Sequence, residues 1–255
     1  MTLSEARLVL EAARISDAAG DARRLLAFSD QSDQDAAEVI HRRAAGEPVS
    51  HILGYRDFWK HRFKVTPDVL DPRPDTETLV ELALQRQFTR VLDLGTGSGC
   101  ILISLLSERP HATGVGSDAS HAAVLVAGEN ARSIGVSDRL ILPVSDWYSD
   151  IGGRFDLIVS NPPYIAASEM ESLQAEVHRE PRMALTDDAE GLSHYRTIAA
   201  GAMDHLTDQG RILVEIGPTQ ARAVSALFAA AGLENITTRP DLDGRDRVVS
   251  ALKTA

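Results

Sequence analysis

Several short segments of this 255-residue chain hold residues of the kind that bind a small ligand or act on one. Gly95-Thr96-Gly97-Ser98-Gly99 follows the apolar run Val91-Leu92-Asp93-Leu94 directly. Glycines at such a strand-to-helix turn let the backbone approach a ligand where any Cβ would collide. For this segment taken alone, a tight turn that binds nothing remains the alternative.

Residues after two further apolar runs favour an adenosine-type ligand. Asp118 follows the next apolar run, where a carboxylate can accept hydrogen bonds from both ribose hydroxyls. Asp146 and Trp147 follow a third run and offer an acceptor and an aromatic face to an adenine. The glycine spacing departs from the dinucleotide fingerprint and no Walker lysine follows it, which disfavours a nicotinamide cofactor or a nucleoside triphosphate.

Asn161-Pro162-Pro163-Tyr164 directly follows another apolar run, residues 155–160. The two prolines fix the backbone just beyond the predicted strand. The Asn161 side-chain oxygen and the Pro162 backbone oxygen are two acceptors that suit a planar –NH2 group, and Tyr164 can lie against its flat face. The segment predicts chemistry on a planar nitrogen, with a simple turn as the alternative.

Regular elements must bring these segments together. Short apolar runs predict strands, and the amphipathic stretches between them predict helices. The predicted strands are residues 90–94, 112–117, 139–144, 155–160, 210–216 and 246–252, and the predicted helices are 76–87, 99–108, 119–134, 192–206 and 218–231. This alternation predicts an α/β fold with a mostly parallel, doubly wound sheet that binds ligands at the carboxyl ends of its strands.

Residues 1–53 predict a small helical bundle. Thr2-Leu3-Ser4-Glu5 fits a capping box, and residues 33–45 form a helix that Gly46 and Pro48 end.

Residues 54–75 predict a linking β-hairpin, because aromatic and charged side chains alternate there. The run Asp71-Pro72-Arg73-Pro74-Asp75 is stiff and cannot be helical, so we place a boundary after it and expect residues 76–255 to form the α/β domain. Residues 165–190 contain no long apolar element and predict a lid or binding loop in which Glu180 and Pro181 help to seat a substrate. A solvated loop acid is the alternative for Glu180.

Composition excludes several classes of protein. With 44% hydrophobic and 25% charged residues, the chain is typical of a folded domain, and no apolar run approaches the ~20 residues that cross a bilayer. The single cysteine, Cys100, excludes an intrachain disulfide and a cysteine-rich zinc site. The start carries charges where a signal peptide would be apolar, so we expect a cytoplasmic protein.

The formal net charge of -11 opposes direct binding of nucleic acid. His41, His51 and His61 match no metal-ligand spacing, so no metal is expected. We expect a monomer, because no obvious apolar helix is left over.

The residues quoted so far resemble the S-adenosylmethionine-dependent methyltransferases that act on planar nitrogens. Within that superfamily the chain resembles the PrmC/HemK type, the glutamine methyltransferases of bacterial peptide chain release factors. The segments that carry this resemblance are Asp71-Pro72-Arg73-Pro74-Asp75-Thr76-Glu77, Ser145-Asp146-Trp147-Tyr148, Glu180-Pro181-Arg182-Met183-Ala184-Leu185 and Asp243-Gly244-Arg245-Asp246-Arg247. Asp71 departs from the usual apolar residue, and Gly114 and Gly116 are expected to loosen the second strand.

The resemblance implies a Rossmann-like class I methyltransferase domain over residues 76–255, with residues 1–53 recognising the substrate. It implies methyl transfer from S-adenosylmethionine to the side-chain amide nitrogen of the glutamine in the Gly-Gly-Gln motif of release factors, leaving S-adenosylhomocysteine. The implied cofactor-binding residues are Gly95, Thr96, Gly97, Ser98, Gly99, Asp118, Asp146, Trp147 and Asn161. The implied substrate-binding residues are Asn161, Pro162, Pro163 and Tyr164, of which Asn161, Pro162 and Tyr164 are catalytic.

Two rival functions remain at this point. An Asn-Pro-Pro-Tyr turn also serves enzymes that methylate an exocyclic amino group of adenine or guanine in RNA or DNA. A non-catalytic adenosine-binding adaptor is the rival from another class, although an adaptor has no use for paired acceptors after the glycine turn.

Overall fold

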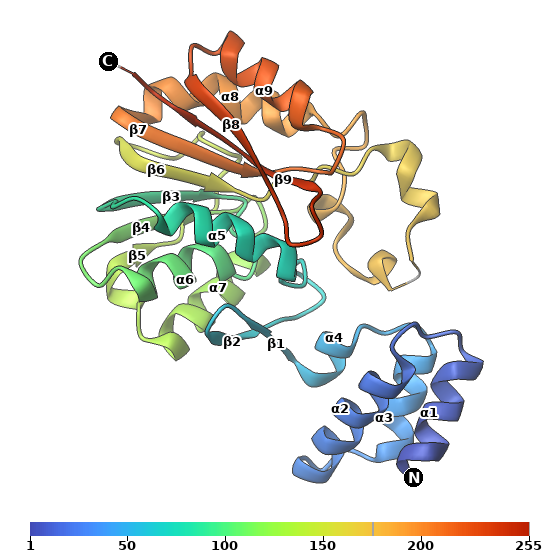
Figure 1. Cartoon of the computed structure of the whole chain (residues 1–255). Helices are drawn as coiled ribbons and strands as arrows, with labels where there is room; N and C mark the ends of the chain where they lie inside the picture. Colours follow the sequence, from blue (N-terminus) through green and yellow to red (C-terminus); the bar gives the residue numbers. More distant parts are fainter. Residues whose placement is uncertain (175, 255) are drawn as a thin grey trace.

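The computed structural model describes residues 1–174 and 176–254, in which a large sheet with covering helices stands beside a helical bundle (Figure 1). The sheet has the strand order β5-β4-β3-β6-β7-β9-β8. Its strands are β3 (Arg90–Leu94), β4 (Thr113–Ser117), β5 (Leu140–Ile141), β6 (Phe155–Ser160), β7 (Leu206–Glu215), β8 (Glu234–Pro240) and β9 (Asp246–Leu252).

Strands β3 to β7 are parallel, whereas β9 runs antiparallel to both β7 and β8. The chain passes from β3 outward through β4 to β5 and then returns to β6 on the other side of β3. Such a reversal leaves a crevice at the carboxyl ends of the two central strands. The prediction of a mostly parallel, doubly wound sheet is confirmed.

Helices cover both faces of the sheet (Figure 1). They are α5 (Glu77–Leu84), α6 (Cys100–Glu108), α7 (His121–Ile134), α8 (Ser193–His205) and α9 (Ala221–Ala230). The first three share one buried apolar cluster with the sheet, and α8 and α9 share another. In the described ranges, no helix combines the length and apolar character that crossing a bilayer requires.

The observed elements differ from the predictions in several places. Strand β8 was missed, because it lies at the sheet edge and most of its side chains are exposed, which leaves little apolar pattern. The strand predicted over 139–144 shortens to β5, and Pro143 prevents a longer ladder. The helix predicted to reach Gln87 ends at Leu84.

The expectation that Gly114 and Gly116 loosen β4 is wrong. A Cβ on Gly114 would stand 2.6 Å from Leu102 Cδ1, and one on Gly116 would stand 2.9 Å from Leu102 Cδ2. These glycines therefore let helix α6 pack directly on a fully paired strand.

The N-terminal bundle contains α1 (Leu3–Ala12), α2 (Ala18–Gln31), α3 (Ala36–Ala44) and α4 (Val49–Leu53). The predicted capping box is present: Thr2 N donates to Glu5 Oε2 at 2.8 Å, and Glu5 N donates to Thr2 Oγ1 at 3.3 Å. The bundle buries its own apolar cluster, with Leu10, Leu25 and Ile40 fully buried. It stands apart from the large sheet in Figure 1.

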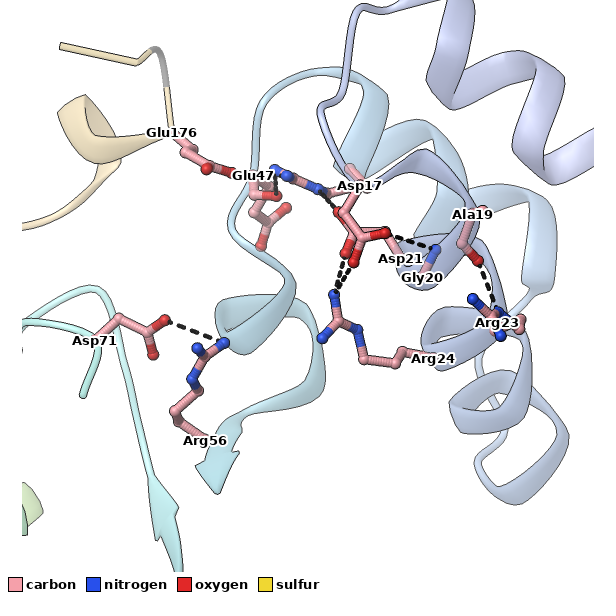
Figure 2. Close-up of polar contacts among 11 residues, drawn as sticks. Asp17, Ala19, Gly20, Asp21, Arg23, Arg24, Glu47, Arg56, Asp71 and Glu176 are labelled. Carbon is pink, nitrogen blue, oxygen red and sulfur yellow. Dashed lines mark hydrogen bonds and ion pairs between the residues drawn. The ribbon is translucent and has the colours of Figure 1, made fainter. Parts of the chain in front are cut away.

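Ion pairs tie the bundle to itself and to the rest of the chain. Asp21 is buried and pairs with Arg43 at 2.7 Å and with Arg24 on the same helix, as Figure 2 shows for Arg24. Arg43 Nη2 also lies 2.7 Å from Glu176 Oε2, in the 165–190 segment. A buried arginine thus joins the bundle to the segment beside the crevice.

The predicted hairpin is formed by β1 (Tyr55–Phe58) and β2 (His61–Lys64), which pair antiparallel. Phe58 and Phe63 are buried in the cluster that α5 and α6 share. Arg56, on β1, reaches toward Asp71 with 3.9 Å between Nη1 and Oδ2 (Figure 2). The hairpin therefore packs on the α/β domain while its first strand continues from the bundle.

Candidate active site

A cavity of about 370 Å³ opens at the carboxyl edge of the sheet. It brings together residues that lie far apart in the sequence and follow different strands. Its lining includes Gly95, Gly97, Asp118, Asp146, Trp147 and Asn161.

The glycine turn follows β3 and begins one side of the cavity. Gly97 has a φ of +54° and donates its backbone N–H to Asp118 Oδ2 at 2.9 Å. Within the described ranges, a Cβ at Gly97 would meet nothing within 4 Å, so it would project into open space. Gly99 differs, because its Cβ would stand 2.7 Å from Ile103 Cδ1. Gly99 therefore serves the packing of α6, and Thr96 and Ser98 complete the lining of this turn.

A buried acid, Asp93, and a half-buried one, Asp118, stabilise the turn. Thr96 Oγ1 donates to Asp93 Oδ2 at 2.7 Å, and burial raises the pKa of Asp93 to about 7. Asp118 accepts from Gly97 N and, at 2.9 Å, from Ser120 N. Burial raises the pKa of Asp118, and these two backbone N–H groups oppose the shift. Asp118 is thus fixed in orientation at the cavity wall.

Trp147 forms an aromatic wall and adopts a left-handed backbone conformation, with a φ of +51°. Such a conformation is costly for a bulky side chain and is held here by Ser145, whose Oγ donates to Trp147 O at 3.1 Å. The Trp147 ring packs against His194, with 5.0 Å between the ring centroids. Asp146 lines the same region and is exposed.

Asn161 begins the opposite wall, directly after β6. Its Nδ2 donates to Thr76 Oγ1 at 3.3 Å. Its Oδ1 is buried and has no hydrogen-bond partner among the residues that the structure describes. Buried acceptors are normally satisfied, so this oxygen is available to an N–H donor in the cavity.

The rest of the Asn-Pro-Pro-Tyr turn is divided between cavity and core. Pro163 lines the cavity, whereas Pro162 is buried behind it. Tyr164 points toward the end of β7, where its hydroxyl donates to Glu215 Oε1 at 3.5 Å. The described lining of the cavity omits Gly99, Pro162 and Tyr164, so their predicted contacts with ligands stay predictions.

Residues of the 181–188 stretch line the cavity, and Glu180 anchors this stretch. The side chain of Glu180 is buried, accepts from Asp71 N at 3.2 Å and pairs with Arg73. Burial raises the pKa of Glu180, and the Arg73 charge opposes that shift. A solvated loop acid is therefore wrong for Glu180, which instead fixes this segment to the linker. Met183 of the segment lines the cavity.

The cavity suits a nucleoside that carries a polar tail. The glycine turn leaves room for a ligand beside the backbone. The fixed carboxylate can accept from sugar hydroxyls, and the aromatic wall offers a flat face to a base. In the parts of the chain that the structure describes, no three acidic, histidine or cysteine side chains gather as a metal site would need.

Sequence reasoning missed the contacts of two residues at this site, Thr76 and His194. Thr76 belongs to a segment that carries the family resemblance, yet its hydroxyl accepts from Asn161 Nδ2 across a sequence separation of 85 residues. His194 lies on α8 and packs against Trp147. Only the fold brings both side chains to the cavity, so no local signal could have found these contacts.

Comparison with known proteins agrees with this geometry. The family described as "Methyltransferase small domain" matches residues 69–193. A release factor glutamine methyltransferase from Cereibacter sphaeroides is 52% identical over 95% of this chain and 94% of its own length. The protein of that name from Caulobacter vibrioides is 42% identical over 98% of this chain and 89% of its own length.

Among solved structures, a methyltransferase from Pyrococcus furiosus superposes with a TM-score of 0.59 at 14% identity, covering 86% of this chain and 98% of that one. This likeness shows the fold alone. The identity to the full-length relatives goes further: the chain belongs to the release factor glutamine methyltransferase family.

Proposed function

We propose that this chain transfers a methyl group from S-adenosylmethionine to the side-chain amide nitrogen of the glutamine in the Gly-Gly-Gln motif of bacterial peptide chain release factors. The observation that carries the proposal is the buried, unpartnered Asn161 Oδ1, counted over the described residues, at the wall of the cavity that the glycine turn also lines. The names of the full-length relatives support the choice of substrate.

The proposed cofactor half of the cavity comprises the glycine turn, Asp118 and Trp147. Asp118 would hold the ribose hydroxyls, Gly97 leaves room for the tail, and Trp147 offers its face to the adenine. When bound, S-adenosylmethionine supplies an electrophilic methyl group on its sulfonium. Asp146, which is exposed at the edge of this half, would accept from the adenine amino group.

The proposed target half centres on Asn161. A primary amide nitrogen is a poor nucleophile, because its lone pair is delocalised into the carbonyl. The Asn161 Oδ1 and the Pro162 backbone oxygen would each accept one amide hydrogen, orient the nitrogen and stabilise the positive charge that develops on it. Attack then needs no basic side chain, and the proton can leave to water afterwards.

The N-terminal bundle, residues 1–53, is proposed as the recognition domain for the release factor, with residues 54–75 as linker and 76–255 as the methyltransferase domain. Its separate core and its ion pair to the 165–190 segment support this role. We further propose that the protein acts as a cytoplasmic monomer without direct contact to nucleic acid, which the net charge of -11 supports.

The test is methyl transfer from labelled S-adenosylmethionine to three substrates: a purified release factor, its Gly-Gly-Gln variant with Gln→Ala, and total ribosomal RNA. Label on the intact release factor alone is the expected result. Label on RNA would favour the nucleic-acid rival, and absence of label from all three would favour the adaptor. Deleting residues 1–53 should abolish labelling of the whole factor while S-adenosylmethionine binding persists; undiminished labelling would reject the recognition role.

A further inference from the structure

We propose that His194, on the first turn of α8, is a positioning residue for S-adenosylmethionine that holds the Trp147 ring in the orientation that the adenine meets. This inference rests on the proposed function, in which Trp147 is the aromatic wall of the cofactor half. Neither His194 nor the helix that carries it has a role in the mechanism derived above.

Trp147 depends on its neighbours for its orientation, because it lies in a turn and not in a helix or strand. The hydrogen bond from Ser145 Oγ to Trp147 O restrains its backbone, but leaves the side-chain torsions free. One edge of the ring comes close to the glycine turn, where a Cβ on Gly95 would stand 3.9 Å from Trp147 Cζ3. A further contact must hold the ring itself.

His194 supplies that contact. Its ring centroid lies 5.0 Å from that of Trp147, with 43° between the two planes, and both side chains line the cavity. Aromatic pairs at this separation attract each other. Because the His194 ring is itself half-buried, it restricts the rotation of the indole beside it.

The next residue along the chain, Tyr148, fixes α8 against the same turn. Its hydroxyl donates to Ile198 O at 3.0 Å, and its ring stacks on His205 with 4.4 Å between the centroids. A Cβ on Gly201 would clash with the Tyr148 ring, so the glycine lets the helix approach this closely. These contacts set the distance between α8 and the turn, and therefore the placement of the first turn of the helix.

The start of α8 is also fixed from the 181–188 stretch. Asp187 Oδ2 accepts from Ser193 N at 2.8 Å, and Asp187 Oδ1 accepts from Gly191 N at 2.8 Å. A carboxylate that accepts from the first N–H groups of a helix stabilises that end. Asp187 lines the cavity as well, so one carboxylate ties the cavity wall to the turn that carries His194.

Two carboxylates face His194, one from Asp187 before α8 and one from Asp146 in the turn. Burial lowers the pKa of His194, and the charges of these carboxylates oppose that shift. The imidazole is therefore neutral in neutral solution and gains its charge on acidification. A protonated imidazole beside an indole quenches its fluorescence, so the contact with Trp147 has an optical signature.

The affinity for S-adenosylmethionine tests the inference. His194→Ala should raise the Kd about fivefold, the value of one aromatic pair. His194→Gln keeps polar atoms without the ring and should lose as much, whereas His194→Phe keeps a ring and should bind within about twofold of the wild-type protein. In labelling of the release factor, the loss should appear in KM for S-adenosylmethionine and not in kcat, because the Asn161 wall is untouched.

His205→Ala is the matched control. His205 lies at the other end of α8 and stacks on Tyr148, and the described lining of the cavity omits it. This variant also removes a histidine ring from an aromatic partner, so its Tm should fall while the Kd of the folded protein stays the same. Equal losses of affinity in His205→Ala and His194→Ala would assign the effect to a loosened α8 and would overturn the inference.

Tryptophan fluorescence gives a readout that a merely structural role would not move. The emission of the wild-type protein should decrease as acidification protonates His194, and His194→Phe should lack this decrease. Trp59, the other tryptophan, contributes equally to both proteins. An unchanged decrease in His194→Phe, or wild-type affinity in His194→Gln, overturns the inference. A wild-type protein that binds S-adenosylmethionine but labels no release factor would overturn the proposed function, and the Kd values would still decide the role of His194.

Discussion

The two walls of the cavity achieve fixed geometry by different physical means. The wall that starts at residues 95–99 uses backbone: glycines expose it, and a half-buried aspartate, Asp118, accepts from it. The wall that starts at Asn161 uses side chains. Asn161 Nδ2 donates to Thr76 Oγ1 at 3.3 Å, and Asn161 Oδ1 has no partner among the described residues. One wall is determined locally and the other by the fold.

That difference should appear as a separation of effects. Changes in the glycine wall should act on binding of S-adenosylmethionine, and changes in the Asn161 wall should act on turnover.

Asn161→Ala should reduce kcat by about 100-fold or more, the scale of one lost preorganised dipole (~3 kcal/mol). Binding of S-adenosylmethionine should weaken far less, because the glycine wall is intact. On the same sample, single-turnover labelling measures the rate of methyl transfer and calorimetric titration measures the affinity for S-adenosylmethionine. Near-wild-type turnover would remove Asn161 from the mechanism.

Gly97→Val should weaken S-adenosylmethionine binding by about 100-fold, because a side chain would occupy the cavity and the left-handed φ of +54° costs roughly 1–2 kcal/mol for a residue with a Cβ. Gly135→Val is the matched control. Gly135 ends α7 with a φ of +82°, and a Cβ there meets no atom of the described ranges within 4 Å. This control should lose stability to a similar backbone strain but keep its affinity for S-adenosylmethionine. Equal losses of affinity in both variants would mean that backbone strain, and not a side chain in the cavity, explains the Gly97 effect.

Asp118→Asn should weaken binding by about 10-fold, since an amide cannot accept from both Gly97 N and Ser120 N and also serve the ligand. Burial raises the pKa of Asp118, so wild-type affinity should fall as the pH decreases and the carboxylate protonates. The variant should lack that dependence. Affinity that varies with pH equally in both proteins would point to a different titrating group.

Tyr164→Phe should lower kcat no more than about fivefold, because the hydroxyl makes one long hydrogen bond, 3.5 Å to Glu215 Oε1, and the ring is kept. Tyr164→Ala, which removes the ring, should cost clearly more. If Phe and Ala behave alike, the hydroxyl matters more than the geometry suggests.

The contrast between the walls also explains what sequence reasoning could reach. The glycine turn, Asp118 and Asn161 were predicted because each lies within a few residues of the strand that positions it. The contact between Thr76 and Asn161 was not predicted, because it joins residues that lie 85 positions apart in the sequence and meet only in the fold. Strand β8 was missed for a different reason: it is an exposed edge strand, so its sequence carries almost no apolar pattern.

The most direct test of the central claim is tandem mass spectrometry of a release factor after reaction with the wild-type protein and S-adenosylmethionine. We expect one added methyl group, on the side-chain amide nitrogen of the Gly-Gly-Gln glutamine, and its loss with Asn161→Ala. A methyl group on any other residue, or one that Asn161→Ala adds just as fast, would contradict it.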